Sequence, residues 1–104
     1  MERIDHHGVP PFLSSLRDRD SETFESVHKM VQRVMAPGKL DSKTKLLIAI
    51  AVDAAQGARA GVENLAKQAR KMGITDEEIQ EALTVAQANV NMYFLSVADA
   101  AFKE

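Results

Sequence analysis

The run LLIAIAV at residues 46–52 is the stretch that decides the fold class. Wound as a helix, this run is apolar on every side, which predicts a central helix over about residues 42–56 that is buried all round. Further helices are predicted over residues 21–35 and 59–72, where apolar residues recur at three- and four-residue steps, and from residue 76 onward. No segment shows sustained two-residue alternation, so the sequence predicts an all-α fold.

Two local signals lie between the predicted helix 59–72 and the last helix. Gly73 fits the C′ position that follows a helix, with Ile74 as the apolar contact that accompanies this cap. Thr75 and Glu78 have the spacing of a capping box, in which Thr75 caps the next helix and Glu78 reaches back to the Thr75 amide. Together the signals predict that one helix ends and the next begins within residues 73–78.

The last helix poses a problem of length. Its apolar residues follow a 4-3-4-3-4 spacing, which is typical of a seam between packed helices. Unbroken from residue 76 to 102, it would be about 40 Å long at ~1.5 Å per residue, whereas a compact chain of this size is roughly 33 Å across. We therefore expect either a break near residues 89–91 or an end that reaches another subunit. The seam comprises Ile79, Leu83, Ala86, Val90, Tyr93 and Val97, and Tyr93 is predicted to be core rather than catalytic.

The composition fits one compact domain over residues 1–104. Of the 104 residues, 45% are hydrophobic and 27% are charged, and the formal net charge is −2. We expect an N-terminal arm over residues 1–20, with one helical turn near residues 12–16, and a helical core over residues 21–102. The slightly acidic balance of charge favours no nucleic-acid partner, and no apolar run approaches the ~20 residues of a membrane span. The lack of a secretory signal favours the cytoplasm.

Few ionisable residues stand out as candidate metal ligands or catalytic groups. His6 and His7 are neighbours that would point to opposite sides of an extended arm, so we expect a solvated N-terminus there and no metal site. Glu25 and His28 have the spacing used by di-iron bundles, but the chain lacks the second pair that such a site needs. Asp53 lies in the last turn of its helix, where its charge opposes the helix dipole. It is expected either to contact an arginine at a subunit interface or to line a functional pocket.

The order of these signals resembles a known family. The segment LDSKTKLLIAIAV at residues 40–52, a helix ending at Gly73, and ITDEEIQEAL at residues 74–83 are similar to the carboxymuconolactone decarboxylase and alkyl-hydroperoxidase-D-like family over about residues 24–88. The resemblance implies an antiparallel bundle of about five to six helices that forms trimers, hexamers or related oligomers, with active sites near subunit contacts. Redox members reduce peroxides or disulfides with a Cys-x-x-Cys pair, a histidine four residues beyond it and a glutamate twelve residues before it.

All four positions of that redox relay are small or apolar in this chain. Ala58 and Gly61 stand at the two cysteine positions, Leu65 at the histidine and Leu46 at the glutamate. Thiol redox chemistry requires a thiolate and a resolving thiol, and a chain without cysteine cannot perform it. We expect the site either to be filled as ordinary core or to form an apolar pocket, floored by Ala58 and Gly61, for a small hydrophobic ligand.

Two functions follow from the resemblance. The first is a non-redox, oligomeric helical protein with a vestigial active site and a binding or structural role, whose expected partner is another copy of itself in a trimer or hexamer. The second is a cysteine-independent enzyme of the lactone-decarboxylase branch, which would act on a small carboxylated or hydrophobic substrate through a general acid or base. A cavity that holds two of its candidate residues would favour the enzyme. These candidates are His28, Asp53, Arg59 and Glu63, and neither function calls for a metal or cofactor.

Overall fold

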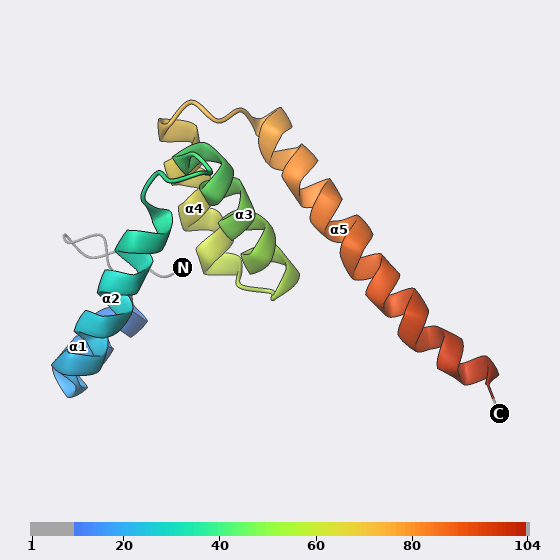
Figure 1. Cartoon of the computed structure of the whole chain (residues 1–104), viewed down its shortest axis with the longest axis horizontal. Helices are drawn as coiled ribbons and strands as arrows, with labels where there is room; N and C mark the ends of the chain where they lie inside the picture. Colours follow the sequence, from blue (N-terminus) through green and yellow to red (C-terminus); the bar gives the residue numbers. More distant parts are fainter. Residues whose placement is uncertain (1–9, 104) are drawn as a thin grey trace. The chain divides into compact units, whose positions relative to one another are not determined.

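The computed structural model describes residues 10–103, which form five α-helices and a final 3₁₀ turn and contain no β-strand. The predicted all-α class is therefore confirmed, and Figure 1 shows the helices in chain order. The chain divides into two compact units, residues 1–42 and 43–104. Each unit is described by itself below.

The first unit contains α1 (Pro11–Arg19) and α2 (Ser21–Met35). Helix α2 has the predicted bounds, but α1 runs for nine residues where a single turn was expected. Pro11 suits the first helical position, because its fixed φ is already helical and it needs no donor there. Asp20 then caps α2 by accepting hydrogen bonds from the Thr23 amide (3.1 Å) and hydroxyl (2.7 Å), and these bonds lower the pKa of the Asp20 carboxyl. A single aspartate thus separates α1 from α2.

The second unit contains α3 (Ser42–Ala55), α4 (Arg59–Lys71), α5 (Asp76–Ala98) and the 3₁₀ turn η1 (Asp99–Phe102). Leu46 and Ile50, one turn apart on α3, are 3% and 0% exposed. On another face of α3, Ile48 and Val52 are about half exposed. The prediction that α3 is buried on every side is therefore wrong for the single chain. The buried residues of this unit are Leu46, Ile50, Ala69, Ile74 and Ile79.

The link between α4 and α5 confirms both local signals. Gly73 has φ +84° and its amide donates to the Arg70 carbonyl, while the Ile74 amide donates to the Ala69 carbonyl, both at 3.0 Å. This is the hydrogen-bond pattern of a Schellman cap, and it needs glycine at the left-handed position. The Ile74 side chain is 2% exposed, so the turn also contributes to the core.

The capping box at the start of α5 is complete. The Glu78 amide donates to the Thr75 hydroxyl (3.1 Å), and the Thr75 amide donates to the Glu78 carboxylate (2.9 Å). The bond from the Thr75 amide lowers the pKa of Glu78, and Lys43 on α3, 3.7 Å from its Oε2, acts in the same direction. The cap therefore favours the ionised form of Glu78.

Helix α5 continues without interruption through residues 89–91 over 23 residues. At ~1.5 Å per residue it is about 35 Å long, and the 3₁₀ turn η1 follows it. The expected alternative of a break near residues 89–91 is therefore wrong.

The ionised cap predicts an acid-dependent loss of stability. Because the pKa of Glu78 is lower in the folded chain than the ~4.3 of an unperturbed glutamate, its contribution is complete above that value and is lost as the pH falls through the folded pKa. The variant Glu78→Gln should therefore be less stable than the parent above about pH 5 and should approach it near pH 3. Urea denaturation between pH 3 and 7 measures the difference, with Glu77→Gln as the control in the same helical turn. A difference that does not change with pH would contradict the role of the charge.

Candidate functional site

The turn between α3 and α4 is where the sequence placed the candidate site. Gly57, at φ +74°, reverses the chain, and the Ala58 amide donates to the Asp53 carbonyl at 2.8 Å. Ala58 is the N-cap residue of α4, and Gly61 lies in the first turn of that helix. Positions 58, 61 and 65 therefore follow one another along one face of α4.

Asp53 lies directly against Gly61. A Cβ added to Gly61 would collide with the Oδ2 of Asp53 and would lie 3.0 Å from its Cγ. A side chain at position 61, including the cysteine that the redox pattern places there, would thus need the space that the Asp53 carboxylate occupies. Glycine is favoured here by this close approach and not by its backbone angle, since no left-handed φ is found at this position. The expected contact between Asp53 and an arginine of another subunit stays a prediction.

A cavity of about 430 Å³ opens beside this turn. It brings Arg59 and Glu63 together, so two of the four candidate residues line one cavity, the arrangement expected to favour an enzyme. Ala58 is among its lining residues, while Gly61 is not and faces Asp53; the predicted apolar ligand pocket stays a prediction. The lining combines one cation and one carboxylate with small and apolar side chains: Ala54, Gly57, Ala58, Arg59, Val62 and Glu63.

The remaining candidates lie elsewhere. His28, in the first unit, stacks on Phe24 with ring centroids 5.3 Å apart and an angle of 12° between the planes, and the Arg17 guanidinium lies 5.3 Å from the centre of the Phe24 ring. Phe24 is 3% exposed, so these contacts place His28 at the edge of a local apolar cluster. His6 and His7 lie outside the described residues. Within residues 10–103, no group of three histidines and carboxylates could hold a metal ion.

Hydrocarbon occupies the other two relay positions. Leu46 is buried on α3 and Leu65 is half-buried on α4. Neither side chain can transfer a proton, so nothing at these positions replaces the glutamate or the histidine of the redox pattern.

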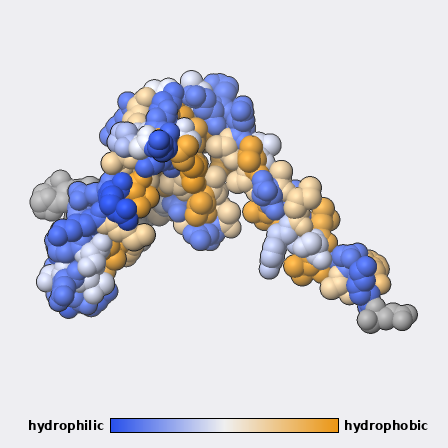
Figure 2. Space-filling model, in the orientation of Figure 1, coloured by the Kyte–Doolittle hydropathy of each residue, from blue (hydrophilic) through white to orange (hydrophobic). Residues whose placement is uncertain are grey.

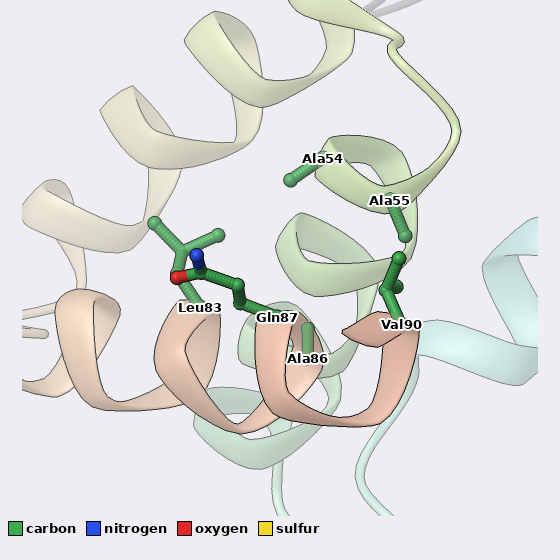
Figure 3. Close-up of a pocket in the computed structure, with 6 residues that line it drawn as sticks. All are labelled: Ala54, Ala55, Leu83, Ala86, Gln87 and Val90. Atoms are coloured by element: carbon green, nitrogen blue, oxygen red, sulfur yellow. The ribbon is translucent and has the colours of Figure 1, made fainter. Parts of the chain in front are cut away.

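A second groove, which the sequence did not reveal, lies between the end of α3 and the middle of α5. Its volume is about 320 Å³. Figure 3 shows two alanines of α3 facing four side chains of α5 across it. In the sequence, only the recurrence of small residues could have indicated this groove. Small residues on a helix can equally well pack closely or leave a gap. The groove is lined by Ala54, Ala55, Leu83, Ala86, Gln87 and Val90.

Beyond this groove, α5 is apolar and exposed. Of the predicted seam, Ile79 is buried, whereas Val90, Tyr93 and Val97 are 48%, 72% and 55% exposed. The prediction that Tyr93 is core is therefore wrong for the single chain. Figure 2 shows hydrophobic atoms along the C-terminal part of α5. The large exposed apolar residues of α5 and η1 are Val85, Val90, Met92, Tyr93, Phe94, Leu95, Val97 and Phe102.

Comparison with known proteins identifies the family. Residues 21–102 match the model of the carboxymuconolactone decarboxylase family. The chain belongs to this family. It has no cysteine, so this member has no Cys-x-x-Cys centre. Within residues 10–103, none of this chain's helices is long and apolar enough to cross a membrane.

Two archaeal proteins are similar to this family member. An uncharacterized protein of Methanocaldococcus jannaschii is 34% identical over 71 residues, which are 68% of this chain and 66% of that protein. The chain thus spans slightly less than two thirds of that relative's length. A crystal structure of a protein from Methanobacterium thermoautotrophicum, a structural-genomics target, has 33% sequence identity and a TM-score of 0.77. The match covers 88% of this chain and 99% of that one.

The contact between Asp53 and Gly61 predicts a coupled pair. Replacing a helical glycine by alanine ordinarily stabilises a protein by roughly 0.5–1 kcal/mol, but Gly61→Ala should not do so while Asp53 occupies the space. In an Asp53→Ala background, the same change should give that gain. We expect a coupling free energy of about 1 kcal/mol in a double-mutant cycle measured by urea denaturation, as for other residues in contact. Additive effects of the two changes would show that the Asp53 carboxylate does not oppose a side chain at position 61.

Proposed function

We propose that this chain is a non-redox, self-assembling member of its family, with a vestigial active site and a binding or structural role. The observation that carries the proposal is the state of the relay: no thiol is present, Asp53 lies where a side chain at position 61 would begin, and two leucines replace the proton-transfer groups. A site that has lost its sulfur and its proton relay together retains only the ability to pack or to bind. The cavity beside Ala58 and Val62 would hold a small hydrophobic ligand in a binding role.

The exposed surface of α5 supports self-assembly. Eight large apolar side chains of α5 and η1 are between 48% and 86% exposed. At ~150–250 Å² for a whole aromatic side chain, they expose on the order of 1,000 Å² together, more than the ~800 Å² that each partner buries in a standard interface. Contiguous apolar surface of this extent marks an interaction site.

The distribution of these side chains supports a trimer or hexamer over a simple dimer. Residues 85–98 contain no charged side chain. Tyr93, Phe94 and Leu95 are consecutive and all more than half exposed, and consecutive residues are about 100° apart around a helix. No single flat partner can cover all three, and a helix that is apolar all round is normally buried on several sides.

Native mass spectrometry tests the assembly. The parent chain should appear as a trimer, a hexamer or a related oligomer at micromolar concentration, and Val97→Lys should shift the population toward monomer, because it would bury an unpaired charge. Gln80→Lys, an exposed change in the first half of α5, is the matched control and should leave the assembly intact. A monomeric parent chain would contradict the proposal.

A second function is favoured by one observation, the presence of Arg59 and Glu63 in the same cavity. An arginine can bind a carboxylate and a glutamate can act as a general acid or base. These are the parts that a cysteine-independent enzyme of the lactone-decarboxylase branch would need, acting on a small carboxylated or hydrophobic substrate.

Ligand binding separates the two functions. If the cavity is an active site of this kind, a panel of small lactone and dicarboxylic acids should contain a compound that raises the melting temperature by mass action. Arg59→Ala should weaken that compound's binding about tenfold, the equivalent of one charge-assisted hydrogen bond. Lys67→Ala, an exposed cation further along α4, should not. Equal weakening of binding in both variants, or no shift in melting temperature with any acid, would exclude the enzymatic function.

A further inference from the structure

The face of α5 that borders the groove has a symmetric pattern of positions about Val90. Toward the N-terminus, this face carries groove-lining residues at positions three, four and seven residues away: Gln87, Ala86 and Leu83. Toward the C-terminus, the same three distances reach Tyr93, Phe94 and Val97, all more than half exposed. One half of the face is thus a groove with small side chains, and the other half is a row of large ones.

We propose that two copies of this chain pack α5 against α5 in antiparallel orientation, about a two-fold axis at Val90, with the partner subunit's Phe94 in the groove between α3 and α5. The inference rests on the proposed self-assembly and specifies which surface of α5 meets which. A two-fold interface is self-complementary, so each contact is made twice.

The sizes of the side chains match in this arrangement. Antiparallel packing about Val90 sets Ala86 opposite the partner subunit's Phe94, where Ala54 and Ala55 of α3 form the other wall of the groove (Figure 3). The groove of about 320 Å³ is roughly ten times the ~30 Å³ that one water takes up in the liquid, which is ample for a phenyl ring. An aromatic side chain that fills a desolvated pocket is the usual anchor of a stable interface.

The chemistry of the other positions matches as well. Gln87 faces the partner subunit's Tyr93, so an amide meets a phenol hydroxyl, and Leu83 faces the partner subunit's Val97, so two apolar groups meet. No charged residue lies between positions 83 and 97, so no like charges meet within this stretch. Antiparallel helices also set the positive end of one dipole beside the negative end of the other.

Parallel packing of the two helices lacks these matches. In that orientation Ala86 would face its own copy and leave the groove empty, while the two Phe94 rings would compete for one space. Unfilled grooves forfeit dispersion contacts that the antiparallel arrangement makes. Met92 and Leu95 lie on another side of the helix and stay available to a further copy, as a hexamer built from two-fold pairs requires.

Single-cysteine variants test the pairing directly, because the parent chain has no cysteine. In Val90→Cys, two thiols meet at the two-fold axis, and oxidation should convert most of the protein to a disulfide-linked dimer. Val85→Cys is the matched control, since Val85 is also exposed (60%) but lies about 140° away around the helix at ~100° per residue. It should form several-fold less linked dimer under the same conditions.

A size swap gives an independent readout. Ala86→Phe fills the groove from within, and Phe94→Ala removes the anchor, so native mass spectrometry should show reduced assembly for each. The double variant Ala86→Phe/Phe94→Ala should restore assembly. The ring introduced at position 86 then fills the groove, and the alanine at position 94 of the partner subunit leaves room for it. Circular dichroism confirms that every variant is folded.

The outcomes separate this inference from the function on which it rests. A monomeric parent chain would overturn both. A second outcome would overturn the antiparallel pairing but leave self-assembly standing. In it, the parent chain assembles, Val90→Cys forms no more linked dimer than Val85→Cys, and the double variant does not recover assembly.

Discussion

The C-terminal half of α5 is the part of this protein on which the rest depends. Residues 85–98 form a regular helix without a charge, and large side chains on several of its sides are exposed in the single chain. Water in contact with that surface is unfavourable in proportion to the apolar area. The core of the second unit, by contrast, has only five buried residues. A chain with this balance has more apolar surface to bury than its own helices cover, and a copy of itself is the partner we propose.

The candidate site combines an intact helical frame with residues that cannot perform thiol chemistry. The helices and the turn on which the sequence predicted the site are present, and the cap before α5 is complete. At the turn, however, Asp53 closes on Gly61, and leucines occupy the relay positions. Any side chain introduced at position 61 would require the Asp53 carboxylate to move. What remains open is a cavity with one cation and one carboxylate, which is suited to binding small molecules.

The cavity beside α4 and the groove beside α5 have different proposed roles. The cavity beside α4 contains the polar pair Arg59 and Glu63, and the groove beside α5 is lined largely by small and apolar side chains. Polar groups in a pocket orient a ligand, whereas an apolar groove next to exposed aromatic residues is suited to a protein surface. Ala54 lines both. A partner side chain seated beside α5 would therefore adjoin the wall of the ligand cavity, which would place that cavity close to a subunit contact.

The sequence by itself determined the helices from residue 21 onward and the link between α4 and α5, but not the length of α1. Gly73, Thr75 and Glu78 act through hydrogen bonds to residues at most five positions away, so their pattern is readable in order along the chain. It also determined that no thiol chemistry is possible. Only the tertiary structure decided that Asp53 meets Gly61, that Arg59 and Glu63 share a cavity, and that the seam of α5 is covered at Ile79 but exposed at Tyr93. Periodicity shows which side of a helix is apolar, but what covers that side depends on contacts between segments that are distant in sequence or belong to different chains.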